Sequence, residues 1–344
     1  MPVLQIGYSE VNIMKKVLIL PGDGVGREVT NAAVAILRAV SDIDIEFARI
    51  GASAYEKTGY YLPPETMNAA SKADAIIATP VYSRVTERKY RDPLATLKKQ
   101  LDMSTVLRQF QPLSDGIGVQ GLDCILISCN PQIVGSSNEI ETLRGVSVES
   151  YIDAVGCKKV IKMAGQIAAV ENRRKIVCLR DLELNRYADS MFTDIFYEEL
   201  AASEFVISDR DVAEAISNLI MDPSIADVII TPIPYSNAIS GVLTGMCGGA
   251  YLTSVGYLGD TGGIFMPMHG PVESLKDLDI VNPTGCILAA AMVLDHFNLK
   301  IEADKIRNAV RSAYRKGMKT QDVGGELSTS EFTYRVSKLC ERSR

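Results

Sequence analysis

The sequence has little of what metal sites and hydrolases are usually built from. Only two histidines occur in 344 residues, and neither a Cys-x-x-Cys nor a His-x-x-x-His pair is present, so a zinc site has little support. Neither His269 nor His296 lies near a plausible nucleophile, which argues against a hydrolase triad. The seven cysteines lie mostly in apolar runs, which indicates buried, reduced thiols in a cytosolic protein.

Long apolar runs and a large charge of one sign are also lacking. No apolar stretch approaches the roughly 18 residues of a membrane span. The net charge is −6 and the pI about 5.2, with lysines and arginines scattered along the chain, which argues against a nucleic-acid-binding protein. The first residues have no cleavable signal pattern. We therefore expect a cytoplasmic protein with no nucleic-acid or membrane partner.

Short apolar runs alternate with helical patterns, and this order predicts an α/β fold. Strands are expected at 16–21, 43–50, 74–80, 123–129, 174–180 and 226–232. Helices are expected at 27–40, 64–73, 211–222, 282–297, 303–319 and 328–342, with a short one near Ala54. Residues 1–13 are predicted to form an N-terminal extension, because the first strand begins only at Lys16.

Four ordered motifs carry a resemblance to a known family. PGDGVGREV (21–29) follows a strand and opens a helix, a setting that suits phosphate binding, although Arg27 interrupts the dinucleotide fingerprint. The other three motifs are GASAYEKTGYYLPPET, MPMHGPVESLKDLDIVNPTG and DVGGELSTSEFT. In this order the four resemble successive segments of the isocitrate/3-isopropylmalate dehydrogenases, the β-decarboxylating dehydrogenases. The resemblance implies their two-subdomain fold, which is not a standard Rossmann domain. Residues 14–112 plus 249–344 would form the large α/β subdomain, and 113–248 the small subdomain with the dimer interface.

The resemblance also implies a metal-dependent oxidative decarboxylation, in which a divalent cation polarises the hydroxyl of the substrate. The segment ITPIPYSNAISGVLTGMCGG is similar to the metal-binding helix of the family. In the family, two aspartates of this helix bind the metal, and they match Asn237 and Gly241 here. A third metal-binding aspartate, which the family donates across the dimer, matches Ala213. These residues do not replace three carboxylates, so Mg²⁺ and Mn²⁺ are not expected to bind. Alternatively, Asn237 only caps a helix over 238–246.

Other positions of the family's mechanism can be matched residue by residue. The first substrate arginine matches Lys98, the second is retained as Arg108, and the third matches Ser128. The catalytic tyrosine matches Gly135, and the catalytic lysine matches Asp181. Lys98, Arg108 and Ser128 are therefore the predicted substrate-binding residues, and Asp181 is the candidate at the catalytic position. The alternatives are that Arg108 is an exposed arginine and that Asp181 is a loop residue.

The cofactor loop of the family is half retained. His269, Gly270 and Asn282 match it, whereas Ser274 stands where an aspartate would select NAD or a lysine NADP. All four residues are candidates for cofactor binding. We expect NAD or NADP to bind weakly or not at all. Without the surrounding motif, His269 would be interpreted as a structural histidine.

Two functions remain open at this point. The favoured one is a ligand-binding or regulatory paralogue impaired in oxidative decarboxylation, because losing the metal removes several kcal/mol of stabilisation and losing the base about 10²–10⁴ in rate. The alternative is an active NAD(P)-dependent dehydrogenase of a 2-hydroxy acid with altered substrate and metal use. A new reaction in a cleft lined by Cys129, Asp181 and Arg108 is a third interpretation. The expected partners are a small anionic ligand and a second copy in a homodimer, or a catalytic paralogue.

Overall fold

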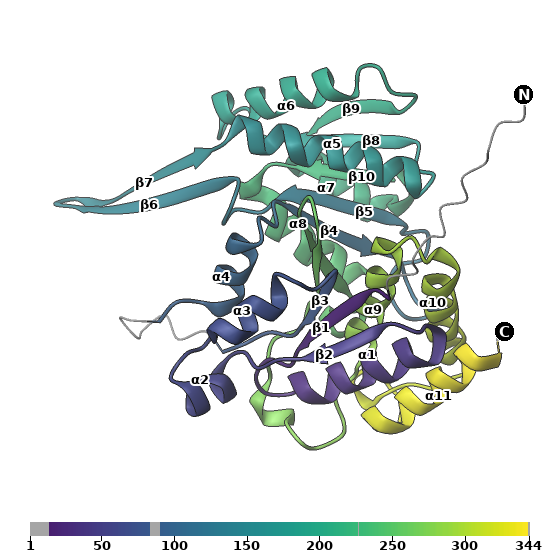
Figure 1. Cartoon of the computed structure of the whole chain (residues 1–344). Helices are drawn as coiled ribbons and strands as arrows, with labels where there is room; N and C mark the ends of the chain where they lie inside the picture. The colour runs from purple at the N-terminus through teal and green to yellow at the C-terminus, as the bar shows by residue number, and fades with distance from the viewer. Residues whose placement is uncertain (1–13, 83–89, 226, 343–344) are drawn as a thin grey trace, which may run out of the picture.

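A ten-stranded sheet runs through the whole molecule (Figure 1). The structure, a computed structural model, describes residues 14–82, 90–225 and 227–342. The order across the sheet is β2-β1-β3-β12-β11-β4-β5-β10-β8-β9. The strands are β1 Lys16–Leu20, β2 Asp44–Phe47, β3 Ala75–Ala78, β4 Thr105–Phe110, β5 Cys124–Cys129, β8 Lys175–Arg180, β9 Val206–Asp211, β10 Val228–Thr231, β11 Ser254–Leu258 and β12 Gly263–Pro267. The pairs β12–β11, β11–β4 and β4–β5 are antiparallel, and the other neighbours are parallel.

Strands from both ends of the chain build one half of the sheet. β1 to β4 lie beside β11 and β12, whereas β5, β8, β9 and β10 form the other half. This arrangement agrees with the expected fold, in which the two chain ends contribute to one part. The proposed boundaries near 112 and 249 remain a prediction, and the proposed extension 1–13 lies outside the described residues.

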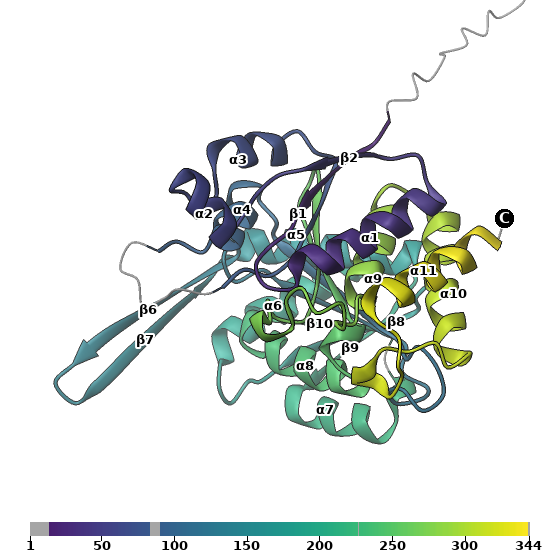
Figure 2. The same ribbon diagram turned by 90° about the horizontal axis from the view of Figure 1, so that it is seen from below.

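Helices cover both faces of the sheet (Figures 1 and 2). One face packs against α1 Gly26–Val40, α5 Ala154–Val170, α6 Arg186–Leu200, α9 Thr284–His296, α10 Lys300–Arg315 and α11 Thr329–Arg342. The other face packs against α3 Pro64–Ala70, α4 Pro93–Gln100, α7 Val212–Met221 and α8 Ile233–Met246. A short helix, α2 Ala52–Thr58, follows β2. Side chains of successive strand residues alternate between the faces, so they reach one buried cluster on the first face and two on the other.

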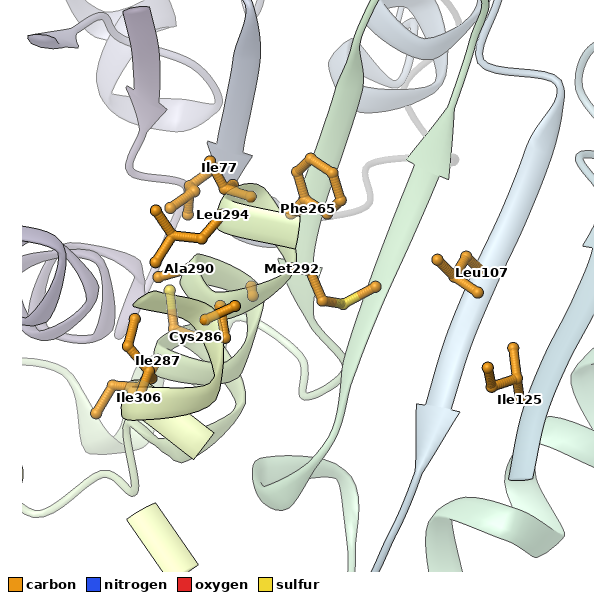
Figure 3. Close-up of a cluster of buried hydrophobic side chains, with 14 of the residues drawn as sticks. Ile77, Leu107, Ile125, Phe265, Cys286, Ile287, Ala290, Met292, Leu294 and Ile306 are labelled. Atoms are coloured by element: carbon orange, nitrogen blue, oxygen red, sulfur yellow. The ribbon is translucent and has the colours of Figure 1, made fainter. Parts of the chain in front are cut away.

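Helix α9 lies at the centre of the larger core. Ten of its 13 residues are buried, which explains why its sequence is apolar on every side and not along one stripe. Figure 3 shows its side chains beside Ile77 of β3, Phe265 of β12 and Ile306 of α10. Each fully buried aliphatic side chain of this kind contributes about 1.5–3 kcal/mol. The N-terminal and C-terminal segments of the chain are held together through this helix.

A two-stranded hairpin projects from the body of the molecule (Figures 1 and 2). It consists of β6 Gly135–Thr142 and β7 Gly145–Ile152, which pair only with each other. Almost all of its residues are exposed, including the apolar side chains of Ile140, Leu143, Val146, Val148 and Tyr151. An isolated ribbon of two strands is at best marginally stable in water. The hairpin is therefore a surface that would gain stability from a partner.

The strands and helices expected from the sequence pattern are all present, with ends shifted by at most four residues. The largest shift is in α10, which begins at Lys300 and ends at Arg315 instead of spanning 303–319. Strands β4, β6, β7, β9, β11 and β12 and helices α4, α5 and α6 were not among the expected elements. Within 14–82, 90–225 and 227–342, no helix combines the length and the apolar character needed to cross a bilayer.

Candidate anion-binding site

Two of the candidate residues, Ser128 and Asp181, lie where neighbouring parallel strands end. The carboxyl ends of β5, β10 and β8 point the same way, because these strands are parallel. Asp181 directly follows β8, and α8 begins two residues after β10. Ser128 lies beside Thr231 in the register of the sheet. In open α/β sheets, ligands bind beyond the carboxyl ends of the strands, so this edge is the expected place for a site.

Arg108 is a buried cation with no ion-pair partner among the described residues. It lies on β4 between Leu126 of β5 and Val255 of β11 and is only 7% exposed. Its Nε and Nη1 atoms are buried and donate to no described acceptor. Burial lowers the pKa of Arg108, and the nearby Tyr257 raises it by a smaller amount. The alternative that Arg108 is an exposed arginine is wrong, because its strand lies in the middle of the sheet.

Lys98 supplies a second buried positive charge on the same side of the sheet. It belongs to α4, is 8% exposed, and has its Nζ atom 3.5 Å from the centroid of the Tyr257 ring. Such a cation–π contact contributes about 0.5–2 kcal/mol. Tyr257 pairs with Val106, two residues before Arg108, so Tyr257 and Arg108 face the same side. The structure thus brings Lys98 and Arg108 to one face, with Tyr257 lying under the lysine.

Ser128 lies on this face as well. It pairs with Val106 on β4, is 1% exposed, and its Oγ atom has no hydrogen-bond partner among the described residues. The hydroxyl of Ser104, just before β4, is likewise buried and unpartnered among the described residues. That of Thr105 is unpartnered too, but Thr105 pairs with Cys129 and points to the opposite face. Buried polar groups are nearly always hydrogen-bonded in folded proteins. A guanidinium and two hydroxyls without described partners therefore suit a ligand with acceptor oxygens.

Asp181 uses its carboxylate to hold the loop that follows β8. Its Oδ1 atom accepts the backbone N–H groups of Glu183 and Leu184 at 3.0 and 2.9 Å. Its own backbone N–H donates to Oδ2 of Asp189 at 2.7 Å. This geometry agrees with the interpretation of Asp181 as a loop residue. A catalytic role for Asp181 remains a prediction.

A buried carboxyl group next to this loop was not recognised in the sequence. Asp189 is fully buried on α6, and its Oδ2 atom accepts the hydroxyl of Tyr235 at 2.9 Å. Asn185 donates to the same hydroxyl oxygen at 2.8 Å. Burial raises the pKa of Asp189 despite these hydrogen bonds, and burial also raises the pKa of Tyr235. Since the three residues are joined only by folding, no local motif could have connected them.

His269 and Gly270 lie in the loop that follows β12. The ring of His269 stacks on Tyr251, with 4.7 Å between the centroids, and its Nδ1 atom lies 2.8 Å from the carbonyl oxygen of Gly270. The Nε2 atom is buried without a described partner, and burial lowers the pKa of the ring. No atom would crowd a side chain added at Gly270. This part of the loop therefore has a free ring nitrogen and open space beside it.

Asn282 and Ser274 have different environments from His269. The amide nitrogen of Asn282 donates to the hydroxyl of Tyr314 and to the carboxylate of Asp322, both at 3.0 Å, and its oxygen accepts the N–H of Thr284. The Asn282 side chain is thus committed to internal contacts. Ser274 is exposed, in the short 3-10 turn Glu273–Leu275. The four candidate cofactor residues do not share one environment.

Comparison with known proteins identifies the family. The model described as isocitrate/isopropylmalate dehydrogenase matches residues 16–336. This chain belongs to the isocitrate/isopropylmalate dehydrogenase family. Its relatives include the 3-isopropylmalate dehydrogenase of Archaeoglobus fulgidus, 31% identical over 340 residues, a match that spans 95% of this chain and all of the relative. The homoisocitrate dehydrogenase of Methanocaldococcus jannaschii is 28% identical over 333 residues, with 92% and 95% covered.

Solved structures agree with this assignment at the level of the fold. The isocitrate dehydrogenase from Methylococcus capsulatus superposes with a TM-score of 0.87 at 23% sequence identity, covering 95% of this chain and all of that chain. A β-decarboxylating dehydrogenase from Thermococcus kodakarensis gives the same TM-score at 24% identity, covering 96% and 97%. The expected isocitrate/isopropylmalate dehydrogenase-like fold is therefore confirmed.

The positions that match the metal ligands of the isocitrate/isopropylmalate dehydrogenase family lie on α7 and α8. Ala213, Asn237 and Gly241 are all exposed. The interpretation of Asn237 as a helix cap is wrong, because Pro232 and the following turn start α8 four residues earlier, at Ile233. Among the described residues, no group of three His, Cys, Asp or Glu side chains could hold a metal ion. None of these three side chains offers a carboxylate.

Proposed function

We propose that this protein is an anion-binding member of the isocitrate/isopropylmalate dehydrogenase family that is impaired in oxidative decarboxylation and acts as a ligand-binding or regulatory paralogue. The observation that carries this proposal is the buried guanidinium of Arg108, whose Nε and Nη1 donors have no partner among the described residues. A buried charge without a counter-charge is unfavourable, so a site that retains one is best explained by an anionic ligand.

The site favours a small ligand with a single anionic group. Lys98 and Arg108 are its two cations, while Ser128 and Asp181 stand where the family has two more. A charge-assisted hydrogen bond contributes about 1.5–3 kcal/mol, so two cations support one carboxylate or phosphate better than the two or three carboxylates of a di- or triacid. A monoacid or inorganic phosphate is therefore the proposed class of ligand.

Support for impaired catalysis comes from the positions that match the proton-transferring residues. A Cβ atom at Gly135 would lie 2.7 Å from Cδ1 of Ile233, so the local packing has no room for a larger side chain without a shift. The Oδ1 atom of Asp181 already accepts two backbone N–H groups of its own loop. We propose that no residue takes over the roles of the family's tyrosine and lysine. We also propose that Mg²⁺ and Mn²⁺ have no specific site, since Asn237 and Gly241 provide no carboxylate.

A nicotinamide dinucleotide is a ligand that family membership suggests. The free Nε2 atom of His269 and the open surroundings of Gly270 would suit part of it. Ser274 offers neither the carboxylate that would bond ribose hydroxyls nor a cation for a 2′-phosphate. We propose that NAD and NADP bind weakly or not at all.

A homodimer is the proposed assembly, with a catalytic paralogue as the alternative second subunit. The apolar side chains exposed on the hairpin include Leu143, Val146 and Val148, and those on α7 include Ile220 and Met221. Exposed apolar groups of this number mark interaction surfaces. Light scattering coupled to size-exclusion chromatography should give twice the mass of 37.4 kDa, and a monomer would contradict the proposal.

The ligand proposal is tested by calorimetric titration of lactate, phosphate and 3-isopropylmalate at constant ionic strength. Lactate or phosphate should bind with the higher affinity. Arg108→Ala should weaken binding at least tenfold, because one charge-assisted contact is worth more than about 1.4 kcal/mol. Arg315→Ala, which removes an exposed arginine from α10, is the matched control and should leave the affinity unchanged. Equal affinities in wild type and Arg108→Ala would refute the assignment of the site.

A further inference from the structure

A pocket lies on the opposite face of the sheet from Arg108. Its lining includes Gln109, Gln111, Asp123, Arg173, Arg307 and Arg311, and its volume is about 300 Å³. Gln109 follows Arg108 on β4, and successive strand residues point to opposite faces. We call this cavity the rear pocket. Both halves of the sheet contribute to it, because β4 and α10 belong to one and the start of β5 to the other.

Every carboxylate around the rear pocket is already paired with a cation. Asp123 pairs with Arg173, and Glu171 pairs with Lys300. Arg307 pairs with Asp304 and with Asp295, which lies behind the pocket and also contacts Lys300. Counted together with Arg311, these four cations and four carboxylates are neutral. An anion would therefore bind in this pocket through individual hydrogen-bond donors and not through an excess of positive charge.

Arg311 is the cation in this set with no carboxylate at ion-pair distance among the described residues. Its two terminal nitrogens donate to the amide oxygens of Gln111 and Asn308, which carry no charge. Burial lowers the pKa of Arg311, and the neighbouring Arg307 lowers it further, while Asp123 and Asp304 raise it. In the same pocket, the Nε atom of Arg173 is buried without a described partner. Two arginines thus have donor capacity that the described protein does not use.

The glutamines add donors beside Arg311. The oxygen of Gln111 accepts from Arg311, and the oxygen of Gln109 accepts from Arg307 at 3.3 Å. Neither amide nitrogen donates to another described group, so both remain available. Leu113, Leu252 and Leu288 form an apolar part of the lining. The pocket combines an anion-binding end with an apolar wall.

We propose that the rear pocket binds a small organic monocarboxylate. The guanidinium of Arg311 and the amide of Gln111 bind the carboxylate, because a guanidinium offers two parallel N–H donors to it. The three leucines contact the apolar body of the ligand. The rear pocket is separate from the site at Arg108 and does not depend on the function proposed for that site. A bound ligand contacts both halves of the sheet and so favours the arrangement in which they are seen here.

Benzoate is a suitable probe, with acetate and inorganic phosphate for comparison. Calorimetric titrations at constant ionic strength use the full chain and four variants: Arg311→Gln, Arg311→Lys, Arg108→Ala and Arg335→Gln. The last removes an exposed arginine of α11 and is the control. Benzoate should bind wild type, Arg335→Gln and Arg108→Ala with the same affinity. Its affinity should fall at least tenfold in Arg311→Gln, and acetate should bind at least tenfold more weakly than benzoate, since it lacks the apolar body. Arg311→Lys, which keeps the charge but not the planar fork, should give an intermediate affinity.

Three results would overturn the proposal. One is the absence of saturable benzoate binding to wild type, and another is phosphate binding as tightly as benzoate and competing with it. The third is benzoate binding that survives Arg311→Gln but is lost in Arg108→Ala. That third outcome would place benzoate in the site at Arg108, so it would support the function proposed above while refuting the rear pocket. Circular dichroism of each variant checks that the fold is retained.

Discussion

Replacing Arg108 with methionine should stabilise the protein while removing its ligand. The guanidinium is 7% exposed and leaves two donors unpaired among the described residues. A buried unsatisfied polar group costs about 1–3 kcal/mol, and methionine fills a similar space without it. For 344 residues, an unfolding entropy of about 2 cal/mol/K per residue converts this gain into a Tm higher by about 1–4 °C.

The assay is differential scanning calorimetry with and without phosphate. Saturating phosphate should raise the Tm of the wild type, because it binds the folded state, and should leave that of Arg108→Met unchanged. Arg307→Met is the control, for which the Tm should change in the opposite direction. Arg307 is bonded to Asp295 and Asp304, so removing it leaves the partly buried Asp295 with only its 3.6 Å contact to Lys300 and should lower the Tm. A loss of several degrees in ligand-free Arg108→Met would refute the reasoning, since it would mean that the guanidinium has a favourable partner.

Three further predictions concern the metal positions, the buried acid and the cation–π contact. The double variant Asn237→Asp/Gly241→Asp should bind Mn²⁺ in calorimetry, since the space around Gly241 is open. The control is the variant with alanine at both positions. If the aspartate variant does not bind Mn²⁺, these positions do not form the former metal site. The pKa of Asp189 is raised in the native state, so the native protein holds this proton more tightly than the unfolded chain does. The free energy of unfolding therefore falls as pH rises from about 4 through the native pKa. Urea unfolding between pH 4 and 7 should therefore show a smaller decline in Asp189→Asn, and parallel profiles would contradict this. Lys98→Met should lower the free energy of unfolding by about 0.5–2 kcal/mol through loss of the Tyr257 contact, and an increase would show that the buried charge is unfavourable overall.

Elements with strong local patterns could be predicted from the sequence. The apolar run at β1 and the apolar helix α9 are examples, and the motifs around them indicated the family. Strands β11 and β12 were not predicted, because each has five residues and includes glycine. Their pairing depends on β4 and β3, which are more than 100 residues away in the chain. No local window contains that information.

The candidate site could be predicted only in part for the same reason. Arg108 and Lys98 were found through the family motifs, and the structure places both on one face. Tyr257 was not found, because it reaches Lys98 only through the β11–β4 pairing. The cap assigned to Asn237 was wrong, since prolines before it start α8 early. Local rules therefore gave the residue types, and the tertiary pairing determined their neighbours.

The central claim is that this member of the isocitrate/isopropylmalate dehydrogenase family binds an anion without carrying out oxidative decarboxylation. The most direct measurement is the rate of NADH or NADPH formation from isocitrate, homoisocitrate or 3-isopropylmalate, with Mg²⁺ or Mn²⁺ and saturating NAD⁺ or NADP⁺. We predict no turnover above the background rate, in a preparation whose Tm rises with phosphate or lactate. Turnover at about 1–10³ s⁻¹, typical of enzymes, would contradict the account and establish an active dehydrogenase.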